Sequence, residues 1–573
     1  MGTAALALVT DAACAPRTEP PLSILLLTLD TTDPRALGCY GGPPGLTPNL
    51  DRLAREGILF ENARAVAPLT LPAHASILTG LYPLRHSIRR NGETVLPAGA
   101  VTLAERARDA GFQTAAVTAA VVLAPEFGLD QGFAHYDAPP TPANVTEHLA
   151  SSRPAAEIAE HALAWLQNRD RGRPFFLWLH FYDPHFPYDP PALPAAAAGD
   201  PYLGEVAAMD AAIGRVLDAL AEEGCLERTV VAAVADHGES RGRHGEETHG
   251  AFVFDSTLRI PLVVRLPGHE RAGERVAGSV SQVDVLPLLL RTAGLPAPGP
   301  DLDGTDPLDA VVPERGAYFE SYFGTNSFGW SPVAGWVDTR GKYVHSSAPE
   351  FFDLARDPGE LEDVLGTHSA EVEHARARLR ELAGRPRLRA EEIDAPQVDL
   401  QREIERLGYA GTGEPRAVEP EPLATTTLPS PHRMVQAYAD YMNGRELHEE
   451  HGDGEEAVRL LRRAVGANPG NHKAWFTLGL ALQNLGRFAD AVDAFERAAA
   501  SAGGERIPAE LNLAVCLYNL GRRSEAIERL DRALRDTPGP PGALELLARL
   551  LAEEGRTEEA GRVRLRLEQS ASP

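Results

Sequence analysis

The chain has 573 residues, 43% of them hydrophobic, which is enough to bury large cores and to form more than one domain. Its 81 acidic residues outnumber its 55 basic residues, so the net charge is −26. This balance argues against nucleic-acid binding and against electrostatic adhesion to anionic membranes. An anionic substrate would therefore need a local positive feature, such as a metal ion. The four cysteines form no Cys-x-x-Cys pair, so neither a disulfide framework nor a thiolate metal site is predicted.

Residues 1–21 precede the first expected strand and form a separate N-terminal segment. Residues 4–9 are apolar, but they are short for a signal peptide, no basic region precedes them, and Asp11 interrupts the run. Ala12-Ala13-Cys14 resembles a bacterial lipoprotein cleavage site. We therefore expect export, to the periplasm or as an anchored lipoprotein, with a cytoplasmic location as the alternative. No stretch approaches the roughly 20 apolar residues of a transmembrane helix, so no such span is predicted.

Segments typical of strands and of helices alternate between residues 23 and 266. Short apolar runs predict buried strands, and apolar residues three and four positions apart predict helices. The expected strands span residues 23–30, 113–119, 174–182, 229–235 and 260–266, and the expected helices begin at residue 47 and span 101–110, 155–168 and 202–223. This alternation predicts a doubly wound α/β domain.

Thr70 stands two positions ahead of Pro72, at the expected start of another helix. Pro72 suits the first turn of a helix, where its missing N–H costs nothing. Thr70 would then lie beside the free N–H groups and the positive dipole end, which favour an anionic ester. Taken alone, a threonine at this place is an ordinary helix cap, so the rest of the chain must decide its role.

Polar side chains end or closely follow three of the expected strands. They are Asp30, Asp183, His185, Asp236 and His237, and we expect Thr70 and His249 to join them. Ligands bind at the carboxyl ends of the strands in open α/β sheets, so these side chains are predicted to lie together. Taken singly, Asp30 reads as a helix cap, and His180 reads as a core histidine inside an apolar strand.

Carboxylates, imidazoles and a hydroxyl make an oxygen-rich site that suits Ca²⁺, Mg²⁺, Mn²⁺ or Zn²⁺. A divalent ion at Thr70 would lower the pKa of its hydroxyl and yield a nucleophile at neutral pH. The same ion would polarise the ester under attack. The sequence leaves the identity of the metal open, and also whether one ion or two are bound.

Beyond this region the sequence pattern changes twice. Residues 310–364 are rich in aromatic and β-forming residues and predict a small antiparallel sheet, which helical sequence follows to about residue 408. Residues 411–432 are rich in Pro, Thr, Glu and Gly and predict a linker. We therefore divide the chain into an N-terminal segment (1–21), a catalytic domain (22–408), a linker (409–432) and a repeat region (433–570).

The repeat region has an internal period of 34–35 residues. Gly452, Gly486, Gly521 and Gly555 are spaced by 34, 35 and 34 positions, and an alanine follows each of them five residues later. The pattern resembles tetratricopeptide (TPR) repeats, which form an all-α solenoid. Its groove would bind a protein or peptide partner. We expect this solenoid to stand apart from the catalytic domain, so that its removal spares activity on a small ester.

Residues 22–408 resemble the sulfatase family of the alkaline-phosphatase superfamily. The matching landmarks are Asp30 after its strand, 38–41 (Gly-Cys-Tyr-Gly), 47–51 (Thr-Pro-Asn-Leu-Asp), 78–83 (Leu-Thr-Gly-Leu-Tyr-Pro) with His86, 183–185 (Asp-Pro-His), 236–239 (Asp-His-Gly-Glu) and 357–360 (Asp-Pro-Gly-Glu). The resemblance implies a doubly wound mixed sheet with a small C-terminal antiparallel subdomain. It also implies metal ligands at Asp30, Asp236 and His237, and a nucleophile at Thr70 that also touches the metal.

The resemblance extends to the remaining site residues. His180, His185 and His249 would line the substrate side or bind a second metal. We assign catalytic roles to Thr70, His185 and His249. Substrate binding is assigned to His74, His86, His180 and Asp183.

The chain departs from the family at the nucleophile. Family sulfatases carry Cys or Ser in a Cys-x-Pro-x-Arg pattern and oxidise it to formylglycine, whereas this chain has Thr70-Leu71-Pro72-Ala73-His74. Threonine cannot become that aldehyde, and His74 replaces the arginine. Thr31 replaces the second of the paired aspartates that many sulfatases place on their calcium. Relatives with a metal-bound threonine include nucleotide pyrophosphatase/phosphodiesterases and the phosphoethanolamine and phosphoglycerol transferases.

We therefore expect a metal-dependent hydrolase of phosphoric or sulfuric esters, with phosphodiesters preferred because the formylglycine mechanism is excluded. One alternative is a transferase, in which an alcohol replaces water. The other is an inactive sulfatase-like domain that serves the repeats as a scaffold.

Overall fold

The computed structural model describes residues 22–92, 94–139, 152–296, 299, 301–309, 315–389, 391–392, 423–450, 452–500, 506–535 and 541–570. The expected export or lipoprotein segment at 1–21 lies outside these ranges, as does most of the expected linker at 409–432. Among the described helices, none is both long and apolar enough to cross a membrane.

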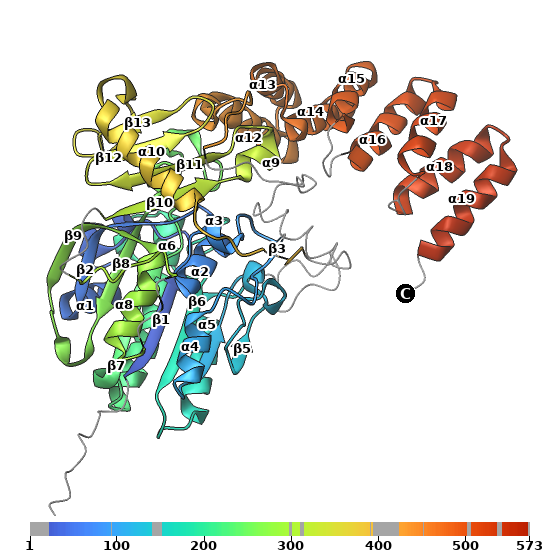
Figure 1. Cartoon of the computed structure of the whole chain (residues 1–573). Helices are drawn as coiled ribbons and strands as arrows, with labels where there is room; N and C mark the ends of the chain where they lie inside the picture. The colour runs from blue at the N-terminus through green and yellow to red at the C-terminus, as the bar shows by residue number, and fades with distance from the viewer. Residues whose placement is uncertain are drawn as a thin grey trace, which may run out of the picture.

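An eight-stranded mixed sheet forms the centre of the N-terminal part (Figure 1). Its strands are hydrogen-bonded in the order β5-β4-β6-β1-β7-β8-β2-β9. Neighbouring strands are parallel, except that β8 runs antiparallel to both β7 and β2. The strands are β1 (Ser23–Leu29), β2 (Ile58–Arg64), β4 (Gln113–Val117), β5 (His135–Asp137), β6 (Phe175–Phe181), β7 (Thr229–Ala235), β8 (Arg259–Arg265) and β9 (Glu274–Ser281).

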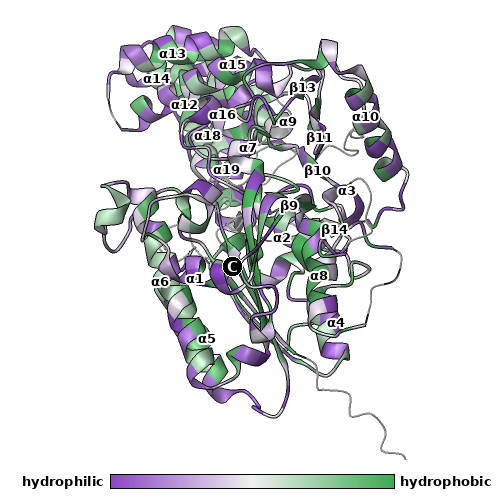
Figure 2. Ribbon diagram, turned by 90° about the vertical axis from the view of Figure 1, so that its left-hand side faces the viewer, coloured by the Kyte–Doolittle hydropathy of each residue, from purple (hydrophilic) through white to green (hydrophobic). Residues whose placement is uncertain are grey.

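Helices cover both faces of this sheet (Figure 2). One face carries α1 (Pro48–Glu56), α5 (Ala155–Asn168) and α6 (Pro201–Glu222), and the other carries α2 (Thr70–Thr79), α4 (Leu103–Asp109) and α8 (Val285–Thr292). The short helices α3 (Pro83–His86) and α7 (Asp255–Leu258) follow α2 and precede β8. Because both faces are covered, β6 and β7 are buried along their whole length, which explains their continuous apolar sequences.

All five strands expected from the sequence are present in this sheet, and the predicted mixed α/β fold is confirmed. Three further strands, β2, β5 and β9, escape prediction. β9 and β5 lie at the two edges of the sheet, and β9 alternates between half-buried and exposed residues over its first half. β5 has only three residues. These two edge strands lack the apolar run that marks the central strands.

A second, four-stranded antiparallel sheet follows, as predicted. It has the order β10-β11-β12-β13 and contains β10 (Gly316–Ser321), β11 (Val333–Asp338), β12 (Gly341–His345) and β13 (Glu350–Phe352). The helix α9 (Phe323–Phe328) lies between its first two strands in sequence, and α10 (Ser369–Ala383) packs against β11. Where helix was expected to continue toward residue 408, a two-residue strand β14 (Glu391–Glu392) pairs instead with β3 (Thr94–Val95).

The C-terminal part consists of helical hairpins, which confirms the all-α repeat prediction. The helices are α12 (Val435–Glu449), α13 (Gly454–Ala467), α14 (His472–Asn484), α15 (Phe488–Ala499), α16 (Arg506–Asn519), α17 (Arg523–Ala533), α18 (Pro541–Glu553) and α19 (Thr557–Ser570). Gly486, Gly521 and Gly555 turn the chain within three of the hairpins, with φ of 70°, 77° and 79°. Only glycine adopts this left-handed conformation without strain, which explains the repeating glycine.

The first hairpin does not stand apart from the sheets. The Tyr438 ring of α12 lies 5.5 Å from the Phe252 ring and 5.4 Å from the Phe328 ring, centroid to centroid. The Asn468 side chain, which follows α13, donates a hydrogen bond of 3.0 Å to the Phe328 carbonyl. Figure 1 shows α12 beside α9. This contact differs from the expectation of a separate solenoid.

Candidate active site

The ends of two neighbouring parallel strands bring the expected metal ligands together. Leu29 of β1 is in register with Ala235 of β7, and each strand ends at that level. The next residues, Asp30 on one strand and Asp236 with His237 on the other, therefore meet. One ligand atom from each of the three lies within 4.8 Å of the others, and all three side chains are fully buried.

The proton on the His237 ring is fixed by the backbone. His237 Nδ1 lies 3.2 Å from the Gly238 carbonyl oxygen, so Nδ1 carries the hydrogen and donates it. Nε2 then presents a lone pair 3.4 Å from Asp236 Oδ2 and 3.9 Å from Asp30 Oδ1. Metal-binding histidines usually donate the hydrogen of their second ring nitrogen to a carbonyl or carboxylate oxygen, as His237 does here.

The two carboxyl groups lack compensating charge. Both Asp30 oxygens and Asp236 Oδ2 have no hydrogen-bond partner among the described residues. Burial raises the pKa of Asp30 well above its usual range, and burial together with the charge of Asp30 does the same for Asp236. A divalent cation would relieve both effects, and two carboxylates with an imidazole are ligands that such ions accept. The side chains present therefore fit a divalent metal.

Thr31 does not join these ligands. Its backbone adopts a left-handed conformation with φ of 47°, and its N–H donates to Asp236 Oδ1 at 3.2 Å. Its hydroxyl donates to the Pro184 carbonyl at 2.8 Å. Strained backbone of this kind is often found at functional sites. Thr31 thus orients Asp236, and its own side chain is directed to the backbone.

Thr70 begins helix α2 directly beside this group. Its hydroxyl oxygen lies 3.4 Å from His237 Nε2, and the residue is fully buried. Leu69 occupies the cap position, so Thr70 is the first helical residue instead of the cap.

The N–H groups of Leu71 and Ala73 at the start of α2 are not free to receive the anion, contrary to expectation. The Leu71 N–H donates to Asn91 Oδ1 at 2.8 Å, and the Ala73 N–H donates to the Leu69 carbonyl at 3.2 Å. Pro72 has no N–H. The other side-chain atom of Asn91, the donor Nδ2, is buried without a hydrogen-bond partner in the described part of the chain. Asn91 was not predicted as a site residue, because nothing in its sequence context marks it.

His74 lies one helical turn beyond Thr70. Its Nδ1 donates to the Thr70 carbonyl at 2.7 Å and lies 3.8 Å from Asp236 Oδ2. Burial and the neighbouring His180 lower the pKa of His74 well below its usual range, so the ring is neutral. His74 therefore cannot supply the positive charge of the arginine that it replaces.

His180 faces Asp30 from strand β6. The Ala119 N–H donates to His180 Nδ1 at 3.2 Å, so the proton of the neutral ring is on Nε2, which lies 3.4 Å from Asp30 Oδ2. Burial lowers the pKa of His180 to about 3. In this tautomer Nε2 faces the Asp30 carboxylate without forming a hydrogen bond to it, and Nε2 cannot bind a metal.

His185 and His249 form a pair on the outer side of the metal ligands. Their Nε2 atoms are 3.2 Å apart. Nδ1 of His185 lies 2.6 Å from the Phe186 carbonyl oxygen, and Nδ1 of His249 lies 3.0 Å from the Pro68 carbonyl oxygen. The His249 ring lies 4.2 Å from the His237 ring, centroid to centroid. Burial lowers the pKa of both residues.

Two further predicted residues make structural hydrogen bonds. His86 binds Ser76 Oγ through Nε2 at 2.9 Å and accepts the Ile88 N–H at Nδ1, so it joins α3 to α2. Asp183 Oδ2 accepts the N–H of Ala155, the first residue of α5, at 2.8 Å. Burial raises the pKa of Asp183 to about 6. The contacts of both side chains thus serve the surrounding helices.

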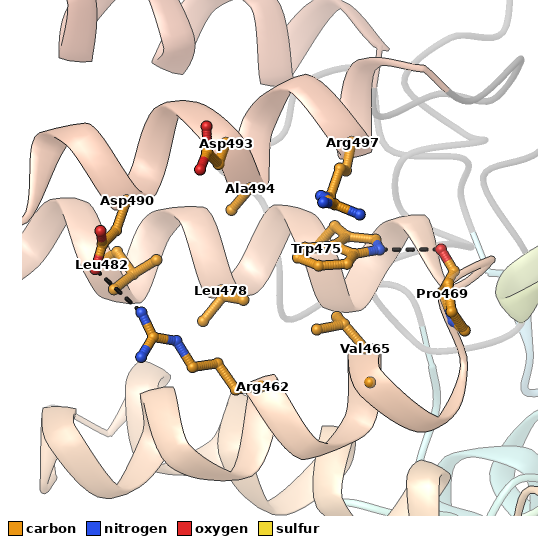
Figure 3. A pocket seen from close by; sticks show the side chains of 11 residues that line it. Arg462, Val465, Pro469, Trp475, Leu478, Leu482, Asp490, Asp493, Ala494 and Arg497 are labelled. Carbon is orange, nitrogen blue, oxygen red and sulfur yellow. Dashed lines mark hydrogen bonds and ion pairs between the residues drawn. The ribbon is translucent and has the colours of Figure 1, made fainter.

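The repeat region has a pocket of its own (Figure 3). It has a volume of about 440 Å³ and lies between α13, α14 and α15. Arg497 lies over the Trp475 ring at 4.7 Å, and the indole N–H donates to the Pro469 carbonyl at 3.0 Å. The pocket mixes apolar and charged side chains, among them the ion pair between Arg462 and Asp490.

Comparisons with known proteins match both parts of the chain. The sulfatase family model matches residues 23–295, and two tetratricopeptide repeat models match residues 446–505 and 486–550. The uncharacterized sulfatase YidJ of Escherichia coli is 29% identical over 418 residues, covering 60% of this chain and 83% of that protein. An arylsulfatase of Clostridium perfringens is 26% identical over 465 residues, covering 63% of this chain and 95% of that protein.

A solved structure shares the fold of the N-terminal part. The phosphonate monoester hydrolase of Agrobacterium radiobacter superposes with a TM-score of 0.51 at 24% identity, over 63% of this chain and 95% of that one. Residues 23–295 therefore form a sulfatase domain, of the kind found in sulfatase-family ester hydrolases, and tetratricopeptide repeats follow it at residues 446–550.

Proposed function

We propose that this hydrolase cleaves a phosphoric ester, with a diester preferred, by a metal-dependent attack of Thr70. The observation that supports this most is the position of the Thr70 hydroxyl oxygen, 3.4 Å from Nε2 of His237 and so beside the three candidate metal ligands. Threonine cannot be converted to formylglycine, which supports the unmodified hydroxyl as the nucleophile.

The metal would be held by Asp30, Asp236 and His237. When bound there, a divalent ion would supply the positive charge that lowers the pKa of the threonine hydroxyl and compensates the anionic ester. The two buried carboxyl groups support such an ion, because carboxylates alone would repel an anionic substrate. Thr31 keeps the Asp236 carboxylate in place through the hydrogen bond described above, and the His180 ring lies beside Asp30.

The reaction then proceeds in two displacements. The Thr70 oxygen forms a bond to phosphorus, the bond to the alcohol oxygen breaks, and the proton of the Thr70 hydroxyl ends on the departing alcohol. His185 and His249 carry this proton through their facing Nε2 atoms. Water then displaces Thr70, regenerating the hydroxyl and releasing the acid. Asn91 Nδ2, buried without a hydrogen-bond partner among the described residues, would donate a hydrogen bond to an ester oxygen in both steps.

Hydrolysis is favoured over the two alternatives drawn from the sequence. The matched relatives are named as sulfatases, which speaks for water as the acceptor in place of a second alcohol. A scaffold without turnover is disfavoured because the three candidate ligands and Thr70 are all kept together. The repeats would bind a protein partner, and the pocket at Trp475 is the part of their surface that we assign to it.

Three chromogenic substrates test the proposal: an aryl sulfate, an aryl phosphate monoester and an aryl phosphodiester. Each is assayed with metal-supplemented wild-type chain and with Thr70→Ala. Turnover of the phosphoesters above the sulfate, lost in Thr70→Ala, is the expected result. Preference for the sulfate would mean that an unmodified threonine performs the sulfatase reaction, and the phosphoester proposal would be wrong.

A further inference from the structure

A large cavity lies between the sulfatase domain and the first repeat helix. Its volume is about 820 Å³. His185, Phe186 and His249 line it from the sulfatase domain, and Tyr441, Met442 and Asn443 line it from helix α12. Cavities of this size hold ligands much larger than a single ring.

The cavity lies beside the reacting centre. His185 and His249 are both lining residues, and the His249 ring lies 4.2 Å from the His237 ring. His237 in turn lies 3.4 Å from the Thr70 hydroxyl. An ester whose reacting atom lies at Thr70 therefore directs its alcohol past the histidine pair and toward α12.

Helix α12 is held firmly in this place. Tyr438 is 3% exposed, and its ring packs between Phe252 and Phe328 of the sulfatase domain. A Cβ atom built on Gly245 would lie only 3.0 Å from Val435 Cγ1, so the loop that carries His249 packs closely against the start of α12. The wall that α12 provides is therefore part of the folded enzyme.

The side chains that line the cavity indicate what kind of chemical group the cavity binds. Phe186 and Tyr188 offer aromatic surface, and the Phe186 side chain is 52% exposed. The charged lining residues carry both signs, for example Arg445 and Glu446 on α12. Aromatic faces with three basic and four acidic side chains suit a large amphipathic group without net charge better than a polyanion.

We propose that α12 of the repeat region forms a wall of the substrate cavity and selects esters whose alcohol part is amphipathic, uncharged and larger than one ring. This inference rests on the proposed function for the position of the reacting ester. It assigns the first repeat helix to substrate recognition in addition to any partner binding by the later repeats.

The test compares a compact and an extended ester of the same acid, 4-nitrophenyl phosphate and 3-hydroxy-2-naphthanilide phosphate. In the full chain, Asn443→Trp fills part of the cavity from an exposed position on α12, which spares the core. We expect KM for the extended ester to rise by about tenfold or more, and KM for the compact ester by less than about threefold. Arg433→Trp, exposed just before α12 and outside the cavity lining, is the matched control.

A binding measurement separates this inference from the proposed chemistry. Calorimetry with Thr70→Ala chain measures the affinity for the extended ester without turnover, with and without Asn443→Trp. If Asn443→Trp weakens binding of the extended ester, the result supports α12 as a wall of the cavity, whether or not the wild-type chain hydrolyses either phosphate. If the wild-type chain hydrolyses neither phosphate, that separate result would overturn the proposed function but not this inference. Equal effects on both esters, an equal effect of Arg433→Trp, or no binding of the extended ester would overturn the inference.

Discussion

The Thr70 hydroxyl oxygen lies 3.4 Å from Nε2 of His237, although 167 residues separate the two in the chain. Thr70 begins a helix on one face of the sheet, and His237 follows a central strand. The Gly238 carbonyl holds the His237 proton on Nδ1, so the nitrogen that faces Thr70 is a lone-pair donor. The hydroxyl is thus adjacent to the candidate metal ligands.

Replacement of the nucleophile is the first prediction. Thr70→Ala should lower kcat by about a thousandfold or more, or about 4 kcal/mol of transition-state stabilisation, because no other hydroxyl replaces it. The fold should persist, since Leu69 occupies the cap position and the Thr70 side chain makes no cap bond. Thr70→Ser, which keeps the hydroxyl, is the control and should retain turnover. Kinetics together with metal analysis of each variant measure this, and comparable loss in both variants would argue against a nucleophilic role.

Asp236→Asn tests the metal site. The amide oxygen can still accept from Thr31 N and His237 N, as Oδ1 does at 3.2 Å and 2.7 Å, while nitrogen replaces the ligand atom Oδ2. Metal content, measured by mass spectrometry, should fall with activity. The metal-free variant should melt at a higher temperature than metal-free wild type, because one of two buried like charges is gone. Full metal occupancy in this variant would rule out Asp236 as a ligand.

His249→Ala tests proton delivery to the departing alcohol. An alcohol with a high pKa needs a proton as it leaves, whereas 4-nitrophenolate leaves readily without one. We therefore expect kcat/KM for a phenyl ester to fall by about a hundredfold or more, and that for the 4-nitrophenyl ester by less than about tenfold. Equal losses for both esters would assign His249 to binding instead.

Asn91→Asp tests the side chain that the sequence did not reveal. Aspartate keeps an oxygen that accepts the Leu71 N–H, now 2.8 Å from Asn91 Oδ1, but removes the buried Nδ2 donor. We expect kcat/KM to fall by about tenfold to a hundredfold, as for other donors to developing charge. Far-ultraviolet circular dichroism should remain unchanged. A variant with normal kcat/KM would show that Nδ2 does not touch the ester.

Glu246→Gln tests how the free energy of unfolding depends on pH through a buried carboxyl group that is not one of the candidate metal ligands. Burial raises the pKa of Glu246 to about 8 from a usual value of 4.5. The folded chain therefore holds the proton of this carboxyl more tightly than the unfolded chain does. The stability that the protonated carboxyl contributes is fully present below pH 4.5 and is lost as the pH rises toward 8, because the unfolded chain ionises first.

Glutamine mimics the protonated form and still accepts the Ala251 and Phe252 N–H groups. Between pH 5 and pH 8, wild type should therefore lose on the order of 3 kcal/mol of unfolding free energy relative to Glu246→Gln. Urea denaturation at several pH values measures the difference. A constant difference across this range would contradict the raised pKa.

The sequence by itself determined the elements that local patterns encode. The apolar runs at 174–182 and 229–235 specified the central strands, because strands buried on both faces must be apolar throughout. Asp30 and Asp236 at strand ends then predicted a shared edge. The spacing of Gly486, Gly521 and Gly555 specified the helical hairpins, because each turn needs a residue with positive φ.

Only the tertiary structure decided which side chains face one another. The tautomers of His180 and His237 depend on Ala119 and Gly238 backbone groups, one of them distant in sequence. Asn91 and helix α12 belong to segments with no catalytic motif. The positions of Asn91 and α12 near the site follow from packing between remote parts of the chain. Sequence patterns encode local geometry and burial, whereas contacts between distant segments arise only once the chain is folded.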